Sequence, residues 1–325
     1  MIQTIGILTG GGDAPGLNAV IRAVTKSAAL GPGWRVVGIE EGYEGLMDPV
    51  RTRPLRPDNV QGILPKGGTI LKTSRCKAFY EEAGREKAAA ILSDAGIDCL
   101  IGVGGDGTFH GLDKLSHEHG VAVIGVPGTI DNDIAGTEFT IGFSTAANTA
   151  LESIDKIRDT AASHDRIFFI EVMGRNCGAL ALEVGLAGGA EGILIPEMTP
   201  DLERLSDIIT EGRQRGKGSF IIVVAEGALK GGAAEAAAAV KERTGVSYRV
   251  SVLGHVQRGG SPTATDRTLA SRMGTAAVVA ATEGRTGAMT GMRDGDIVLV
   301  PLAETWLGET FIDLSLLGVA EITAT

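Results

Sequence analysis

Short apolar runs alternate with amphipathic stretches along most of this 325-residue chain. This alternation restricts the possible folds more than any other feature of the sequence. The apolar runs, each bounded by Gly, Pro or Asp, are Ile5–Thr9, Val36–Ile39, Cys99–Val103, Val121–Val126, Ile167–Val172, Gly192–Ile195 and Phe220–Ala225. The amphipathic stretches are Leu17–Ala29, Glu82–Ala95, Thr145–Ala161, Leu202–Arg213 and Ala233–Arg243. Strands that are apolar on both faces and separated by helices are typical of parallel sheets covered on each side. We therefore predict an α/β protein with three-layer domains of mostly parallel sheets flanked by helices.

The length suggests about two domains, at ~150 residues each. The region around Phe139–Thr145 is a plausible crossover between them, because glycine–aspartate loops give way there to arginine-rich ones. Hydrophobic residues make up 43% of the chain but aromatic residues only 4%, so the core is expected to be aliphatic. The 48 glycines follow no period and indicate turns between short elements.

The formal net charge of −10 argues against a general nucleic-acid or membrane-surface role. Phosphorylated small molecules remain possible ligands, because local arginines and backbone N–H groups bind them. The cysteines, Cys76, Cys99 and Cys177, are far apart and form no CxxC motif, which favours reduced thiols over disulfides or zinc ligands. The N-terminus enters an apolar strand without a basic segment, and the apolar runs are shorter than the ~20 residues of a membrane span. We expect a cytoplasmic protein.

Glycine and polar residues follow four of the predicted strands. They form the segments Gly10–Gly16 (GGGDAPG), Gly104–Thr108 (GGDGT), Pro127–Asp133 (PGTIDND) and Met173–Gly178 (MGRNCG). Ligands of parallel sheets bind at the carboxyl ends of the strands. We therefore expect these four segments to converge on one sheet edge and to form a site.

The first two segments are suited to phosphate binding. Glycines let backbone N–H groups approach a phosphate, and the helix start that follows Gly10–Gly16 favours negative charge. A tight turn explains a lone glycine triplet equally well. In the segment Gly104–Thr108, Asp106 offers the carboxylate that Mg²⁺ prefers, although an aspartate here can also simply cap a helix.

The segment Pro127–Asp133 contains two carboxylates and a hydroxyl directly after a strand. Asp131 is suited to take a proton from an alcohol during phosphoryl transfer, and Thr129 to donate a hydrogen bond to the transferring group. Asp133 can assist Asp131 or a metal ion. The alternative is a solvated, aspartate-rich loop.

Several arginines and a histidine could bind a phosphate monoester, since guanidinium pairs with phosphate in a bidentate manner. They are Arg75, Arg166, Arg175, Arg249, Arg258 and His255. Any one of these arginines taken alone is more often part of a surface ion pair. Met173 could line a sugar or belong to the core. The other histidines, His110 among them, show no metal-ligand spacing and are expected to be structural or solvated.

The chain resembles the bacterial ATP-dependent 6-phosphofructokinases (phosphofructokinase A family) from about Thr4 to Met273. The matching segments, in order, are LTGGGDAPGLNAVIR, GGDGT, GVPGTIDNDI, IGFSTA, VMGR and LGHVQRGGSP. The resemblance implies transfer of the γ-phosphoryl of Mg-ATP to the 1-hydroxyl of fructose 6-phosphate by a homotetramer. It further implies an ATP domain of residues 1–142 plus about 257–308, and a fructose 6-phosphate domain of 143–256 plus about 309–325.

The resemblance also assigns site residues. ATP contacts would be Gly12, Tyr43, Arg75, Cys76, Gly105, Asp106, Gly107, Thr108 and Gly111, with Asp106 also holding Mg²⁺. Asp131 would be the catalytic base, with Thr129, Arg75 and Arg175 on the transferring phosphoryl group. The sugar would contact Asp133, Met173, Gly174 and Glu226. The 6-phosphate would be held by His255 and Arg258, and by Arg166 and Arg249 of a neighbouring subunit.

Two glycines bear on the phosphoryl donor. Pyrophosphate-using members of the family usually carry Asp at the position of Gly107 and Lys at that of Gly128, so the resemblance favours ATP. An effector site would use Arg22, Lys26, Arg158 and Glu191. Small residues flank Lys217, and Pro57 stands where an effector-contacting arginine would lie. We therefore predict weakened or altered allostery.

Three alternatives stay open. The first is a pyrophosphate-dependent phosphotransferase acting on the same sugar. The second is an NAD or lipid kinase that shares GGDGT, which leaves PGTIDND and LGHVQRGGSP unexplained. The third is a non-catalytic nucleotide-binding sensor, which the complete set of Asp106, Asp131 and arginines disfavours.

Overall fold

A computed structural model describes residues 2–310 and 312–324. The chain divides into two compact units. Unit 1 comprises Met1–Thr129, Ile134–Ser144 and Arg258–Phe311, and unit 2 comprises Ile130–Asp133, Thr145–Gln257 and Ile312–Thr325. The short segment Ile130–Asp133 groups with unit 2, although the residues on both sides of it belong to unit 1. Asp131 therefore belongs to unit 2, whereas β5 (Ala122–Thr129), which leads into it, belongs to unit 1.

Unit 1 is built on a sheet of eight strands among the described residues, seven of them in the order β12-β11-β5-β4-β1-β2-β3. The central strands β1 (Thr4–Thr9), β2 (Arg35–Ile39), β4 (Cys99–Gly104) and β5 (Ala122–Thr129) are parallel. Strand β11 (Ala288–Arg293) continues the parallel set beside β5. The edges β3 (Thr52–Leu55) and β12 (Asp296–Pro301) are antiparallel, and β6 (Ile141–Gly142) pairs with the end of β5.

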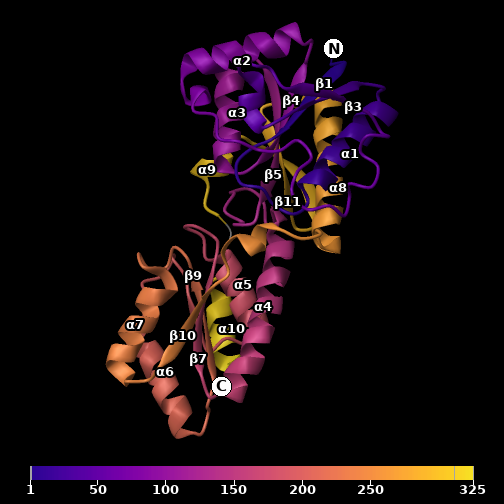
Figure 1. The fold of residues 1–325 in the computed structure, drawn as a ribbon. Helices are drawn as coiled ribbons and strands as arrows, with labels where there is room; N and C mark the ends of the chain where they lie inside the picture. The colour runs from indigo at the N-terminus through magenta and orange to yellow at the C-terminus, as the bar shows by residue number, and fades with distance from the viewer. Residues whose placement is uncertain (1, 311, 325) are drawn as a thin grey trace. The chain divides into compact units, whose positions relative to one another are not determined.

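Helices cover both faces of this sheet (Figure 1). Helices α1 (Leu17–Leu30) and α8 (Ala264–Thr282) pack together on one face, and α2 (Glu82–Asp94) and α3 (Asp106–His119) lie on the other. The short helix α9 (Glu304–Leu307) contacts α3, and the 3₁₀ turns are η1 (Gly42–Leu46) and η2 (Ala78–Tyr80). The layers bury a mainly aliphatic interior, which also holds the aromatic rings of Tyr43, Phe79 and Phe109.

Unit 2 has a smaller, fully parallel sheet in the order β10-β7-β9-β8. Its strands are β7 (Ile167–Val172), β8 (Gly192–Leu194), β9 (Phe220–Ala225) and β10 (Tyr248–Val252). Helices α6 (Leu202–Gln214) and α7 (Gly232–Thr244) cover one face, and α4 (Phe143–Ser163), α5 (Ala179–Ala187) and α10 (Ser315–Thr323) lie on the other (Figure 1). The 3₁₀ turn η3 (Gly254–Arg258) follows β10.

The predicted fold class is confirmed, and every predicted strand and helix is present. One expectation was wrong: the four glycine-containing strand ends do not share one sheet edge. Strands β1, β4 and β5 end at one edge of the unit 1 sheet, whereas the segment Met173–Gly178 follows β7 in unit 2. The alternation of strands and helices is the same in both units, so the sequence pattern could not separate the two sheets.

All three cysteines are buried and free. Among the described residues, no helix combines the length and apolar character needed to cross a membrane.

The thiols should react slowly in the native protein. Burial raises the pKa of Cys99 to about 12 and that of Cys177 to about 11, and burial together with the neighbouring Glu44 raises the pKa of Cys76. Since the thiolate is the reactive form, we expect less than one thiol per chain to react promptly with a disulfide reagent at pH 8. Protein unfolded in guanidinium chloride should release all three. Rapid labelling of native protein would contradict the buried placement.

Candidate active site

Two glycine-rich loops lie side by side in unit 1, because they follow the neighbouring parallel strands β1 and β4. The N–H of Gly10 donates to the carbonyl of Val103 over 2.9 Å, which ties the first loop to the end of β4. The buried hydroxyl of Thr108 fills the space between the loops, and a β-carbon at Gly10 would lie 2.6 Å from it. We name this pair of loops, Gly10–Gly16 and Gly104–Thr108, the glycine-rich edge.

Thr129 also reaches this edge. It ends β5, which pairs with β4, and a β-carbon at Gly105 would lie 3.7 Å from the Thr129 Cβ. The preceding glycine, Gly128, is tightly packed, since a β-carbon there would lie 2.6 Å from Leu17 Cδ2. At Gly107, in contrast, no atom lies within 4 Å of an added β-carbon. The edge is thus open at Gly107 and closed at Gly128.

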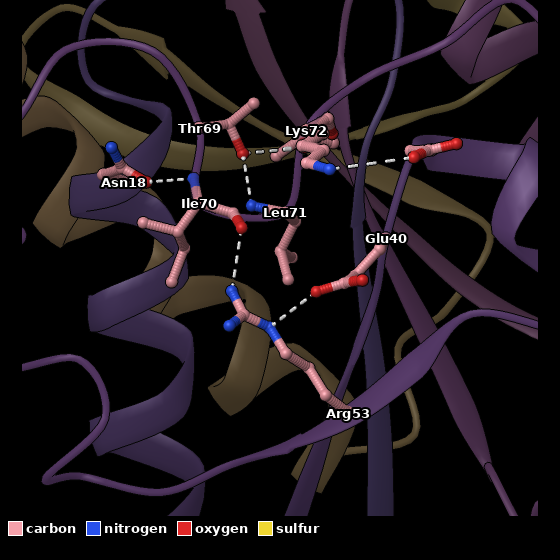
Figure 2. Close-up of polar contacts among 9 residues, drawn as sticks. Asn18, Glu40, Arg53, Thr69, Ile70, Leu71 and Lys72 are labelled. Carbon is pink, nitrogen blue, oxygen red and sulfur yellow. Dashed lines mark hydrogen bonds and ion pairs between the residues drawn. The ribbon is translucent and has the colours of Figure 1, made fainter.

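An irregular segment, Thr69–Thr73, is fastened to the unit 1 core by buried or half-buried side chains (Figure 2). Asn18, which is 1% exposed, accepts a hydrogen bond from the N–H of Ile70 over 2.7 Å. Arg53 donates to the carbonyl of Ile70 over 2.8 Å and pairs with Glu40 at 3.2 Å. These contacts hold a chain segment that belongs to no helix or strand.

The same segment is joined directly to the glycine-rich edge. The hydroxyl of Thr9, at the end of β1, donates to the carbonyl of Lys72 over 2.8 Å. The hydroxyl of Thr73 donates to the carbonyl of Gly11, also over 2.8 Å. Arg75 follows two residues later and is exposed. These hydrogen bonds therefore fix the backbone position of Thr73, and with it the position of Arg75 relative to the loop Gly10–Gly16.

Aromatic residues line the flank of α3. Tyr43 and Phe79 stack with ring centroids 3.8 Å apart, and the Tyr43 hydroxyl donates to the carbonyl of Thr108 over 2.6 Å. Gly111 leaves room for the ring, because a β-carbon there would lie 2.7 Å from Tyr43 Cε2. Cys76 belongs to the same apolar cluster. Burial raises the pKa of the Tyr43 hydroxyl, so this group remains a hydrogen-bond donor at neutral pH.

Asp106 opens helix α3 after the extended residue Gly105. Its side chain is 51% exposed, and its Oδ1 lies 3.3 Å from Nε2 of His110, one turn later. Among the described residues, no group of three or more His, Cys, Asp or Glu could hold a metal ion by itself. One exposed carboxylate beside an open glycine fits Mg²⁺ that arrives with a nucleotide, since this ion keeps waters and phosphate oxygens as ligands.

Arg258 lies against the first glycine-rich loop. A β-carbon at Gly12 would be 2.8 Å from its Nη1, so the guanidinium occupies the space that a side chain at this position would need. Its Nε is buried and has no hydrogen-bond partner in the described part of the chain. The sequence indicated an arginine for a sugar phosphate here, but gave no sign of its contact with Gly12.

In unit 2, Asp131 and Arg175 form an ion pair, with 3.4 Å between Oδ2 and Nε. The Asp131 side chain is 4% exposed and that of Arg175 is 57% exposed. Both Asn132 and Arg175 have positive φ, near 52°, which is uncommon outside glycine and clusters at functional sites. The thiol of Cys177 donates weakly to the carbonyl of Asn132, which links the two loops.

The strands β7, β9 and β10 end beside Asp131 in unit 2, and we name this end the polar edge. Gly174 has φ of 136° and lies so close to the carbonyl of Cys177 that a side chain would not fit. The N–H of Arg175 donates to the Glu226 carboxylate over 2.8 Å. Other predicted site residues at this edge are the buried Met173, the half-buried Asp133 and the exposed His255.

Arg166 and Arg249 lie at the opposite end of the same sheet. Arg166 immediately precedes β7, and Arg249 is paired with Phe168 near the start of β7. Arg175 follows the end of this six-residue strand. At ~3.3 Å per residue, the strand separates Arg166 from the polar edge of its own unit by about 20 Å. Arg166 therefore cannot share one small ligand with Arg175 within this chain.

The predicted effector residues are split between the units. Arg22 and Lys26 lie one turn apart on α1 in unit 1. In unit 2, the buried Glu191 pairs with Lys217 at 2.9 Å and with Arg158 at 3.8 Å. Lys217 also donates to the carbonyl of Ala324, and Arg158 to those of Gly188 and Gly189. The side chains of Lys217 and Arg158 are thus both already bound to oxygen atoms of the protein.

Comparisons with known proteins identify the family of this chain. A family model described as Phosphofructokinase matches residues 4–281. The chain is 53% identical over 324 residues to ATP-dependent 6-phosphofructokinase 1 of Thermus thermophilus, covering 99% of this chain and 100% of the relative. The structure of phosphofructokinase from Saccharomyces cerevisiae superposes with a TM-score of 0.87 at 37% identity, covering 93% of this chain. The chain spans only 45% of that longer yeast chain.

A further solved structure, a pyrophosphate-dependent phosphofructokinase from Marinobacter aquaeolei, has a TM-score of 0.83 at 26% identity, covering 97% of this chain and 86% of its own. The Thermus thermophilus relative, matched over its full length, has about twice this sequence identity to the chain, 53% against 26%. The family model and the full-length relative lead to the same conclusion: the chain belongs to the phosphofructokinase family.

Proposed function

We propose that this protein is an ATP-dependent 6-phosphofructokinase, which transfers the γ-phosphoryl group of ATP to the 1-hydroxyl of fructose 6-phosphate. The observation that carries the proposal is the buried Asp131 carboxylate beside the exposed guanidinium of Arg175. A carboxylate in such a place can accept a proton, and the neighbouring cation can meet an incoming phosphoryl group. The full-length similarity to a bacterial ATP-dependent enzyme supports the same donor and acceptor.

Asp131 acts as the general base. It takes the proton of the sugar 1-hydroxyl as the oxygen attacks the γ-phosphorus and the bond to the β-phosphate oxygen breaks. Arg175 has two roles, because it pairs with the Asp131 carboxylate and stabilises charge on the transferring group. Arg75 supplies a second positive charge, and Thr129 a hydrogen bond. Most of the acceleration comes from such positioning and charge stabilisation.

The nucleotide binds at the glycine-rich edge. Backbone N–H groups around Gly12 and Gly105 approach its phosphates, and Tyr43, Cys76 and Gly111 flank the nucleoside. Asp106 is the residue that would hold Mg²⁺, an ion that neutralises phosphate charge when bound. The sugar binds at the polar edge, with Glu226 and Met173 against its ring and His255 on the 6-phosphate. The family resemblance assigns Arg258 to the same phosphate.

A second subunit completes the site. Arg166 lies a strand length from the polar edge of its own unit, and Arg249 lies beside the second residue of the same strand, so both are available to a neighbouring copy of the chain. We infer a homo-oligomer, with a tetramer as the expected form, in which these arginines bind the 6-phosphate held by the neighbour.

Space at two glycines favours ATP over pyrophosphate. The open surroundings of Gly107 leave room for the α-phosphate and nucleoside, which a carboxylate at this position would repel. The packed surroundings of Gly128 leave no room for a lysine, the residue that pyrophosphate users usually carry.

Initial rates test the donor. With fructose 6-phosphate and Mg²⁺, we expect fructose 1,6-bisphosphate from ATP and none from pyrophosphate. Gly107→Asp should raise the KM for ATP at least about tenfold, because unit charges ~4 Å apart repel by up to about 4 kcal/mol near a protein surface. Gly107→Ala is the matched control, since its methyl group fits without charge. Activity with pyrophosphate alone would refute the proposed donor.

Removal of the base should slow the reaction without releasing the sugar. We expect Asp131→Asn to lower kcat by ~10²–10⁴-fold, the usual contribution of a general base, with little change in the KM for fructose 6-phosphate. Asp155→Asn, the same change at an exposed position on α4, should behave as the unaltered protein. An Asp131→Asn variant with normal turnover would exclude Asp131 as the base and revive a non-catalytic role.

Allosteric control should be weak. Binding sites that are strongly coupled shift affinity by ~5–150-fold, whereas Lys217 and Arg158 are already bound to protein oxygens. We therefore expect ADP or phosphoenolpyruvate to change the half-saturating concentration of fructose 6-phosphate by less than about fivefold. Steady-state rates at fixed ATP, with and without each compound, give this ratio. A shift of tenfold or more would show that these contacts exchange readily for a phosphorylated ligand.

A further inference from the structure

His110 lies between two groups that come from different parts of unit 1. Its Nε2 is 3.3 Å from Oδ1 of Asp106, one helical turn earlier on α3. Its ring stacks on the indole of Trp306, with centroids 3.9 Å apart and an interplanar angle of 27°. The imidazole therefore has one face covered by an aromatic ring and one nitrogen beside a carboxylate.

Trp306 is itself well held. It belongs to α9 and packs against the aliphatic core of unit 1. The adjacent Thr305 is buried, its hydroxyl donates to the carbonyl of Leu302, and its own carbonyl accepts from the N–H of Ala135. The indole thus presents a fixed surface to His110.

This fixed surface matters because Asp106 has little else to hold it. Its side chain is half exposed, and the glycines on either side of it offer no side-chain contacts. In the described part of the chain, this carboxylate has the His110 imidazole 3.3 Å away. Without the imidazole, the carboxylate would be free to sample several rotamers, and each binding event would have to select one of them.

We propose that His110, held in place by Trp306, is a positioning residue that orients the Asp106 carboxylate for the metal-bound nucleotide. The inference rests on the proposed function, in which Asp106 holds Mg²⁺. Carboxylates that bind metal ions are commonly hydrogen-bonded by a second layer of residues, and loss of such a partner typically costs ~10–100-fold in metal affinity or activity. Trp306 acts indirectly, because it holds the His110 ring, which in turn orients the Asp106 carboxylate.

The test compares binding of a nucleotide with and without the metal. Titration calorimetry with the non-hydrolysable ATP analogue AMP-PNP gives one Kd in Mg²⁺ and another in EDTA, and their ratio measures the benefit of the metal. We expect His110→Phe, which keeps an aromatic ring against Trp306 but removes the nitrogen, to reduce this benefit about tenfold. Binding in EDTA should stay unchanged, whereas general damage to the helix would weaken both affinities.

Three variants complete the design. His110→Gln places a polar nitrogen at a similar reach and should recover most of the metal benefit. Trp306→Ala should lower the benefit in the same direction as His110→Phe, while Trp306→Phe should keep it. The half-saturating concentration of fructose 6-phosphate should stay the same in all four variants, because none of these side chains lies at the polar edge.

Asp106→Asn separates the two ways in which the test can fail. If this variant retains the full metal benefit, the assignment of Mg²⁺ to Asp106 is wrong and the proposed function needs another ligand. If Asp106→Asn loses the benefit while His110→Phe keeps it, only the positioning role of His110 is refuted. An increased benefit in His110→Phe would also overturn the inference, because it would mean that the imidazole competes with the metal.

Discussion

Parallel pairing of β4 with its two neighbours is the constraint on which unit 1 depends. Strand β4 is in register with β1 along Ile5–Thr9 and with β5 along most of its length, so the three strands end at nearly the same level. The main-chain hydrogen bonds of this pairing bring the two glycine-rich loops together, although almost one hundred residues separate them in the chain. The side chain of Thr108 then fills the space between the loops. This space exists because Gly10 and Gly104 have no side chains.

Unit 2 uses the same principle with different side chains. Its parallel strands bring Glu226 and the loop that contains Arg175 to one end, and the positive φ of Arg175 aims its guanidinium at Asp131. Strained backbone is stable here because the neighbouring glycine and the hydrogen bond from Arg175 to Glu226 fix the loop. The cation beside a buried carboxylate is therefore a result of loop geometry as much as of residue type.

Much of this arrangement follows from local sequence. Continuous apolar runs such as that of β9 predict buried parallel strands, and strand ends rich in glycine and aspartate predict the residues of both edges. The pattern is less informative for α8, which is rich in alanine and shows little amphipathicity, and for β10, which is a half-exposed edge strand.

Contacts between distant segments left no local signal. His110 has the spacing of an ordinary solvent-exposed helix residue, and only the tertiary structure brings Trp306 onto its ring. The role of Asn18 has a weak signal, because an amide among the apolar residues that open α1 must find buried hydrogen-bond partners. The division of four strand ends between two sheets could not be predicted either, since local periodicity does not record which strands pair.

The interleaving of the two units has a consequence for how the chain matures. Strands β11 and β12 complete the unit 1 sheet but are translated after all of β7–β10. Until Ala288 and Met289 arrive to pair with it, β5 is an open sheet edge with a strongly apolar sequence. Such edges promote association between chains, so the ribosome-bound intermediate carries an aggregation hazard that the finished protein lacks. For the same reason, neither unit can be excised as one continuous fragment, and the loops that join them are poor places to cut the gene.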